Sequence, residues 1–162
     1  MAKHYYTVTW DQLHRDARAL AWRLMGLRPA DRGWRGIVAV SRGGLIPAAI
    51  VARELECRLV ESVSVTAYDE ETPGPPAIIK PPSAAGDGTG FLVVDDLVDT
   101  GATIRAVRAL LPRAHYGCVY AKPAGRDSID TFITEVSQDT WILFPWDTEP
   151  QFVAPLAKRA AG

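Results

Sequence analysis

Short apolar runs alternate with amphipathic stretches along this chain, as in proteins whose strands and helices follow one another. Apolar and β-branched residues of the kind found in buried strands make up the runs 36–40 and 91–94. Further strands are predicted at 59–68, 115–121 and 131–136. Because helical segments separate these strands, the pattern favours an α/β fold with a mostly parallel central sheet flanked by helices.

Helices are predicted where apolar residues recur every three or four positions. Thr9 and Gln12 bracket a predicted capping box, in which the Thr hydroxyl and the Gln amide close the N-terminus of a helix. That helix has one apolar face and is expected to end near Gly26. Two more helices are predicted over 45–55 and 104–111.

Two segments show no clear period. Residues 69–90 are first acidic and then rich in Pro, and so long a connection inside a compact domain is usually either a functional lid or a disordered insert. We therefore expect 69–90 to be a flexible active-site loop without regular structure. The tail 141–162 is rich in Trp and Pro. Because no repeat and no linker divides the chain, we predict a single domain over residues 1–162.

The composition narrows the class of protein. With 162 residues the chain is long enough for a substantial core, and a net charge of −1 gives no basic footprint for nucleic acid. The two cysteines, Cys57 and Cys118, lie in apolar surroundings, which favours buried reduced thiols over a disulfide. No apolar run approaches the roughly 18 residues of a membrane span, and the first residues lack the apolar core of a signal peptide. We expect a cytoplasmic protein.

Three carboxylates and a turn of small residues lie between a predicted buried strand and a predicted helix. Asp95 and Asp96 follow the apolar run, Asp99 comes next, and Thr100–Thr103 open the helix. Backbone N–H groups at a helix N-terminus bind phosphate, and ligands of α/β sheets bind at this edge. Acids there would repel a phosphate unless they bind sugar hydroxyls or a divalent cation. The pattern suggests a sugar phosphate with magnesium, although one Asp-Thr-Gly turn is also an ordinary cap.

Three other segments are predicted at the same edge. Arg42 and Gly43 lie in a Ser-Arg-Gly-Gly turn, where Gly permits close approach of a ligand and Arg supplies charge for phosphate. Lys122 follows a predicted strand, where it can donate to a carbonyl oxygen of a ligand. The aromatic segment 141–146 offers a plane on which a base can stack. Taken alone, each segment is more typical of a plain turn, a solvated lysine or a packed core.

Together these motifs resemble a known family. Residues 93–103, VVDDLVDTGAT, closely resemble the phosphoribosyl pyrophosphate (PRPP) signature of type I phosphoribosyltransferases. Other segments are similar, in the same order, to those of the bacterial xanthine-guanine phosphoribosyltransferases of the purine-salvage branch. These segments are YTVTWDQL at 6–13, VSRGGLIPA at 40–48, GDGTGF at 86–91, AKPAGR at 121–126 and QDTWILFPWD at 138–147.

The resemblance implies the type I phosphoribosyltransferase fold, with a small hood and tail formed by residues 137–162. It implies transfer of the 5-phosphoribosyl group of PRPP to N9 of guanine or xanthine, and more weakly hypoxanthine. The products are GMP, XMP or IMP and pyrophosphate, and the implied cofactor is Mg²⁺. Members are commonly homotetramers built from dimers, so a homo-oligomer (tetramer or dimer) is expected.

The resemblance also assigns roles to single positions. Asp99 is the expected catalytic residue, near N7 of the purine. Asp96 is the expected metal ligand and, with Asp95, is expected to meet the ribose hydroxyls. The turn of Arg42 carries a non-proline cis peptide in this family. The residues expected to bind PRPP are Arg42, Gly43, Asp95, Asp96, Leu97, Val98, Asp99, Thr100, Gly101, Ala102 and Thr103. The residues expected to bind the purine are Asp99, Lys122, Trp141 and Ile142, with Lys122 on the 6-oxygen, Trp141 stacked and Ile142 main chain at position 2.

Two features depart from the family pattern. The loop of relatives usually carries several basic residues, whereas here Lys80 is the single positive residue in 69–82, which predicts closure that is either weaker or supported differently. Ala67-Tyr68 stands where a Ser-Tyr pair is common, so a hydroxyl contact is lost. Some relatives associate with the inner face of the membrane; the near-neutral charge and the lack of a basic amphipathic helix do not favour such a peripheral location here.

The alternatives differ in the chemistry that they require. A non-catalytic, nucleotide-binding regulatory relative would keep the phosphate turn without needing Lys122 and Trp141, and both are present. A phosphoacceptor signalling domain needs its acids on two different strands, whereas here all three share one. A Walker-type hydrolase is excluded because no G-x-x-x-x-G-K-[ST] occurs. The preference among guanine, xanthine and hypoxanthine stays open.

Overall fold

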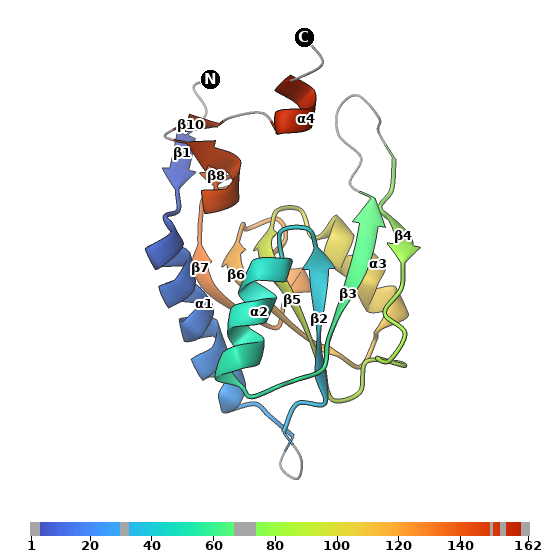
Figure 1. Ribbon diagram of the computed structural model, residues 1–162. Helices are drawn as coiled ribbons and strands as arrows, with labels where there is room; N and C mark the ends of the chain where they lie inside the picture. The colour runs from blue at the N-terminus through green and yellow to red at the C-terminus, as the bar shows by residue number, and fades with distance from the viewer. Residues whose placement is uncertain (1–3, 30–32, 67–73, 150, 153–154, 160–162) are drawn as a thin grey trace.

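A six-stranded sheet forms the centre of the molecule (Figure 1). The computed structural model describes residues 4–29, 33–66, 74–149, 151–152 and 155–159. In sheet order, the strands are β4 (Ala77–Lys80), β3 (Val60–Thr66), β2 (Gly36–Ser41), β5 (Phe91–Val98), β6 (His115–Ala121) and β7 (Thr131–Glu135). All neighbouring strands pair in parallel except β4, which lies antiparallel to β3 at the edge. The predicted mostly parallel sheet is confirmed.

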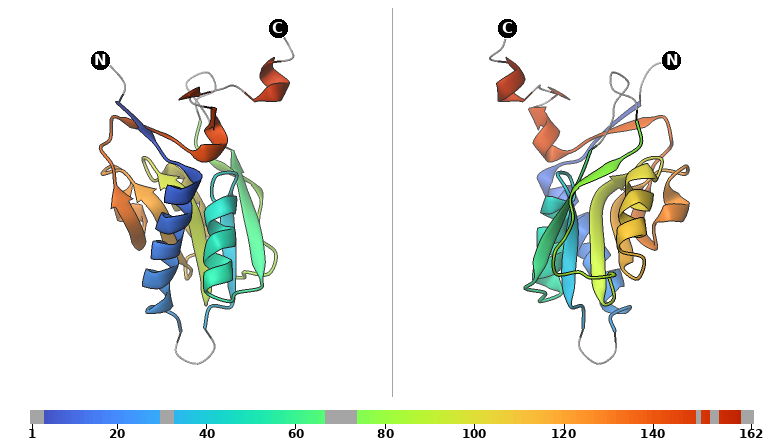
Figure 2. Two further views of the ribbon diagram at one scale, coloured as in Figure 1. Left: turned by 60° about the vertical axis from the view of Figure 1, so that its left-hand side comes forward. Right: turned by 90° about the vertical axis from the view of Figure 1, so that its right-hand side faces the viewer.

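Helices cover both faces of this sheet (Figure 2). The helices α1 (Trp10–Met25) and α2 (Leu45–Glu54) lie side by side on one face, and α3 (Ala102–Leu110) lies on the other. The predicted capping box is half right: the Gln12 backbone N–H donates to the Thr9 hydroxyl at 3.2 Å, whereas the Gln12 amide donates to the Tyr6 hydroxyl instead of returning to Thr9.

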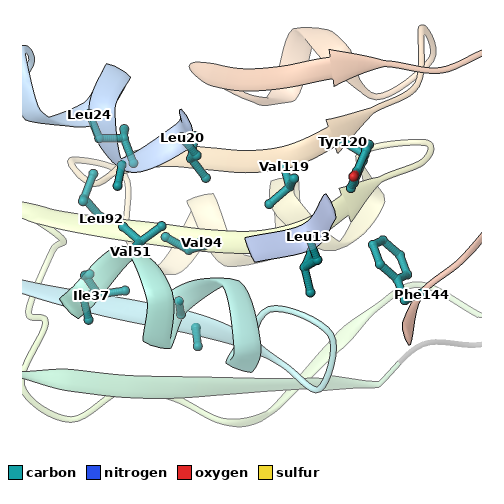
Figure 3. Close-up of a cluster of buried hydrophobic side chains, with 14 of the residues drawn as sticks. Leu13, Leu20, Leu24, Ile37, Val51, Leu92, Val94, Val119, Tyr120 and Phe144 are labelled. Carbon is teal, nitrogen blue, oxygen red and sulfur yellow. The ribbon is translucent and has the colours of Figure 1, made fainter. Parts of the chain in front are cut away.

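The core is divided by the sheet because successive residues of a strand point to opposite faces. On the side of α1 and α2, Leu13, Leu20 and Leu24 pack against strand residues such as Leu92 and Val119 (Figure 3). These three leucines are fully buried, and each contributes roughly 1.5–3 kcal/mol through the hydrophobic effect. Residues of α3 and of the alternate strand positions form the second cluster on the other face. This packing holds the carboxyl ends of the strands at one edge.

A small unit lies over that edge and corresponds to the predicted hood (Figure 1). Its first part is β8 (Thr140–Leu143), which pairs in parallel with β1 (His4–Thr7) from the other end of the chain. Its remaining elements are the 3₁₀ turn η2 (Pro145–Asp147), β9 (Thr148–Glu149), β10 (Gln151–Phe152) and α4 (Leu156–Arg159). The hood therefore also uses an N-terminal strand, which the hydrophobic pattern did not predict.

Two predictions about element bounds are wrong. The strand predicted at 91–94 continues to Val98, so Asp95 and Asp96 lie within β5 and not in the turn after it, because pairing with β6 continues to Val98. The segment 69–90 was expected to lack regular structure, yet its described part contains β4. Residues 69–73 and the Ala67-Tyr68 pair lie outside the described residues. Within the described residues, none of the helices has the length and apolarity needed to cross a membrane.

Candidate active site

The turn after β2 lies directly against the acid pair of β5. The peptide bond between Ser41 and Arg42 is cis, as expected. The Ser41 hydroxyl lies 3.2 Å from the Val63 carbonyl and 3.1 Å from the Ser64 hydroxyl, which ties the turn to β3. Gly43 faces Asp96, and Arg42 is exposed. The arginine and the acid pair therefore meet at the same edge.

Asp95 and Asp96 are held by backbone donors. The Asp96 N–H donates to Oδ1 of Asp95 at 2.8 Å, and the Leu97 N–H donates to Oδ1 of Asp96 at 2.7 Å. Burial raises the pKa of Asp95 well above its usual range, and the neighbouring Asp96 raises it further. Burial also raises the pKa of Asp96, with a contribution from Asp147, although hydrogen bonds to the charged form oppose this shift. Burial and neighbouring carboxylates thus disfavour the doubly ionised form of the pair.

The donor set of this acid pair fits magnesium. Magnesium binds one or two carboxylates and completes its octahedral shell with water and substrate phosphates. A divalent cation would favour the ionised forms of Asp95 and Asp96, which burial and mutual repulsion disfavour. Asp96 is the more accessible of the two, since Asp95 is buried. Asp96 is thus the better-placed ligand.

The turn between β5 and α3 encloses a small cavity of about 130 Å³. Its lining residues are Asp95, Leu97, Val98, Asp99, Thr100, Gly101, Ala102, Thr103 and Ile104. Gly101 has φ +86°, in the left-handed region, and a Cβ there would lie 2.6 Å from the Arg105 guanidinium. Arg105 also donates to the Thr100 carbonyl at 3.1 Å. Backbone N–H groups at the start of α3 and a nearby cation make this cavity suitable for phosphate.

A lysine and an amide hold the carboxylate of Asp99. The Lys122 ammonium donates to Oδ2 of Asp99 at 3.0 Å, and the Gln138 amide donates to Oδ1 at 2.6 Å. The Lys122 side chain is only 7% exposed, whereas that of Asp99 is 54% exposed. The Lys122 N–H also donates to the Val98 carbonyl at 2.9 Å, which fixes the end of β6 beside the end of β5. A donor and an acceptor thus lie side by side at the sheet edge.

The hood brings the aromatic segment to the same place. Trp141 and Ile142 lie on β8, three and four positions after Gln138, whose side chain contacts Asp99. The Trp141 side chain is half exposed, and Ile142 is buried. Farther along the hood, Phe144 stacks on Trp146 with ring centroids 4.8 Å apart. The aromatic rings of Phe144 and Trp146 therefore pack on each other within the hood.

The structure brings together the turns that the sequence predicted to converge. Gly43 joins the arginine turn to Asp96, and the Lys122–Asp99 pair joins the lysine turn to the phosphate turn. Sequence reasoning missed Gln138, Arg105 and Asp147. Gln138 begins a segment that had been noted only for its resemblance, and Asp147 ends it. Their contacts depend on long-range folding, which local patterns do not reveal.

The arrangement of a phosphate turn, an acid pair and an arginine turn on the carboxyl edge of such a sheet defines the phosphoribosyltransferase fold. The model of the phosphoribosyl transferase domain family matches residues 9–152. A xanthine-guanine phosphoribosyltransferase of Gluconobacter oxydans is 62% identical, with 96% of this chain and 92% of that protein covered. Another from Cereibacter sphaeroides is 56% identical, with 95% and 93% covered.

The comparison with a solved structure supports the same family. The purine phosphoribosyltransferase from Pyrococcus horikoshii superposes with a TM-score of 0.74 at 28% identity, over 93% of this chain and 99% of that one. The chain therefore belongs to the phosphoribosyltransferase family and, within it, to the group of the xanthine-guanine phosphoribosyltransferases.

Proposed function

We propose that this protein is a purine salvage enzyme that transfers the 5-phosphoribosyl group of PRPP to N9 of guanine or xanthine, and more weakly hypoxanthine. The products are GMP, XMP or IMP and pyrophosphate. The observation that carries this proposal is the buried Lys122 ammonium, 3.0 Å from Asp99 and beside a phosphate-sized cavity. The names of its relatives support the choice of bases.

The pair of Lys122 and Asp99 is complementary to one edge of a 6-oxopurine. That edge presents an acceptor at O6 and, in the N7–H tautomer, a donor at N7. Lys122 has donors only, so it pairs with O6, and the Asp99 carboxylate accepts from N7–H. Adenine has an amino group at position 6, which would place a donor against the Lys122 donor. A buried unpaired donor is costly, so adenine is rejected.

The phosphoribosyl group and the pyrophosphate are assigned to the other two turns. The residues around the cavity, from Leu97 to Thr103, hold the 5′-phosphate through N–H groups at the start of α3. Asp95 and Asp96 accept hydrogen bonds from the ribose hydroxyls. Arg42 and the backbone of Gly43 contact the pyrophosphate, next to Asp96. On the hood, Trp141 stacks on the purine, and the main chain at Ile142 reads position 2.

The reaction exchanges one bond to C1 of the ribose for another. N9 of the purine donates its electron pair to C1 as the bond from C1 to the pyrophosphate oxygen breaks, and pyrophosphate leaves with that bonding pair. The N7 proton passes to the carboxylate of Asp99. Asp95 and Asp96 stabilise the positive charge that develops on the ribose. Magnesium, when bound at Asp96, supplies charge neutralisation for the departing pyrophosphate.

The segment 69–90 is proposed to cover this site, and residues 137–162 to form its purine-binding hood and tail, within a single domain of residues 1–162. The Lys80 ammonium donates to the Ser62 carbonyl at 3.0 Å. This contact holds Lys80 on the sheet edge, so closure over pyrophosphate depends on other groups. The carboxylate of Glu61, on β3, accepts from the Ser83 and Ala84 N–H groups at 3.0 and 2.8 Å. These hydrogen bonds anchor the later part of the segment 69–90 to β3.

Two further properties remain predictions. A homo-oligomer, a dimer or a tetramer, is supported by large exposed aromatic side chains such as Trp10 and Trp22, and analytical ultracentrifugation would measure it. A cytoplasmic location, with or without peripheral contact at the inner face of the membrane, fits the free thiols of Cys57 and Cys118, the second buried and the first partly so.

A turnover assay tests the proposed function. The purified protein is incubated with Mg²⁺ and PRPP and with guanine, xanthine, hypoxanthine or adenine, and nucleotide and pyrophosphate are measured. We expect products with the three 6-oxopurines and none with adenine, and no turnover when EDTA removes the metal. Binding of GMP without turnover of any base would instead identify a non-catalytic nucleotide-binding relative.

A further inference from the structure

The side chain of Gln138 bridges two turns of the site. Its Nε2 donates to Oδ1 of Asp99 at 2.6 Å, and its Oε1 accepts from the Ala124 N–H at 2.9 Å. The two partners fix the orientation of the amide, because a backbone N–H only donates and a carboxylate only accepts. Gln138 therefore links the turn after β5 to the turn after β6.

We propose that Gln138 is a positioning residue, which holds the carboxylate of Asp99 in the orientation that accepts the purine N7 proton. This inference rests on the proposed function and assigns a residue to the same site. Gln138 touches neither reacting atom in this scheme; it acts through Asp99.

The need for such a residue follows from the two donors to Asp99. In the structure Lys122 donates to Oδ2 of Asp99, but purine binding shares the Lys122 ammonium with O6. Asp99 lies on a turn and is more than half exposed, so burial does not hold its side chain. The purine does not compete with Asp99 for the Gln138 amide. The second contact of Gln138, with the Ala124 N–H, keeps the Gln138 side chain in place.

The position of Gln138 also couples base stacking to catalysis. Gln138 lies three positions before Trp141 in the segment that leads into β8. A purine stacked on Trp141 therefore contacts the same segment whose Gln138 holds the Asp99 carboxylate. Misplacing a catalytic group by about 1 Å costs roughly 100-fold in rate, so partial loss of this restraint is expected to lower kcat more than substrate binding.

Single and double variants test the inference. Gln138→Ala is expected to lower kcat for guanine about tenfold while the KM for PRPP changes less than about twofold. In an Asp99→Asn background the same change is expected to have less than about a twofold effect, because the two residues act as a unit. Gln138→Glu keeps an acceptor for Ala124 but removes the donor to Asp99, so its loss should equal or exceed that of Gln138→Ala.

One variant serves as the control, and three results would overturn the inference. Gln12→Ala is the matched control: it removes the same kind of amide from α1, where Gln12 donates to the Tyr6 hydroxyl, and should leave kcat within about twofold. Wild-type kcat in Gln138→Ala would overturn the inference. So would an equal loss in the Asp99→Asn background, or recovery by Gln138→Glu, since each would assign the effect to the Ala124 contact.

A second measurement does not depend on turnover. A crystal structure of Gln138→Ala is expected to show the Asp99 carboxylate rotated away from its wild-type direction, and an unchanged Asp99 would overturn the inference. An inactive wild-type protein would reject the proposed function, and the orientation of Asp99 in the variant would still decide the role of Gln138. Circular dichroism confirms that each variant is folded.

Discussion

Gly43 packs against the carboxylate of Asp96 so closely that no side chain fits between them. A Cβ added to Gly43 would lie 2.1 Å from Oδ2 of Asp96 and 2.5 Å from its Cγ. Real Cβ atoms do not approach so closely, and the obstructing group is itself held by the Leu97 N–H. This contact joins the arginine turn of β2 to the acid pair of β5, so the two halves of the proposed PRPP site depend on each other.

Gly43→Ala is therefore expected to displace Asp96 and disrupt the PRPP site. We expect kcat/KM for PRPP to fall at least about tenfold, because catalysis depends on sub-ångström placement of charged groups. Steady-state kinetics with varied PRPP and Mg²⁺ would measure the change. Gly26→Ala is the matched control: its Cβ would meet only the Arg23 carbonyl, at 3.7 Å, and activity should stay near wild type. Equal activity of both variants would contradict the proposed site.

Lys122→Ala is expected to lower kcat/KM for guanine by about tenfold or more, because it removes the charged donor to O6 and one of the two donors to Asp99. Purine kinetics at saturating PRPP would measure this loss. Arg53→Ala removes a positive charge at an exposed position in α2 and should have little effect. An unchanged kcat/KM in Lys122→Ala would refute the role assigned to this lysine.

Asp99→Asn is expected to lower turnover while leaving PRPP binding largely intact. Asn keeps the size of the side chain but cannot take up the N7 proton, and general-base catalysis typically contributes about 100-fold or more. Isothermal titration with PRPP and Mg²⁺, beside kcat measurements, separates the two effects. If PRPP binding were lost instead, Asp99 would be a residue that holds the ligand and not the base.

The sequence predicted the parts of the fold that local patterns determine. The strand at His115–Ala121 and the bounds of α2 to within one residue follow from apolar runs and helical spacing. The strand β4 was missed, because flanking prolines mask it and its pairing partner, the edge of β3, comes from tertiary structure. The strand β1 was missed for the same reason, since its partner β8 is more than 130 residues away in the chain.

In the candidate site, too, features of local sequence were predicted and long-range contacts were not. The acids, the arginine turn and Lys122 were predicted because charged or glycine-rich turns after strands meet at one sheet edge. The contact between Gly43 and Asp96 and the bridge made by Gln138 were not predicted. Neither contact has a signature in spacing, because each depends on side-chain packing between turns far apart in the chain.

His115 gives the protein a pH-dependent stability that is separate from the site. Burial lowers the pKa of His115, and Arg108 lowers it further, while Asp130 opposes the shift. The Nε2 atom lies 2.8 Å from the Thr131 hydroxyl, and the ring packs beside Trp34 with centroids 5.8 Å apart. The folded protein therefore binds a proton at His115 less readily than the unfolded chain, whose histidines titrate near 6.5.

The sign of the effect follows from proton linkage. Below a pH of about 6.5 the unfolded state binds more protons at this position, so the contribution of His115 to the free energy of unfolding falls as pH decreases, and this contribution is constant above that pH. We expect this contribution to lower Tm between pH 7.5 and pH 5.5, and His115→Asn to remove that fall. His14→Asn, on the surface of α1, is the control and should retain it. An equal pH dependence of Tm in wild type and His115→Asn would show that burial of this imidazole does not govern stability in this range.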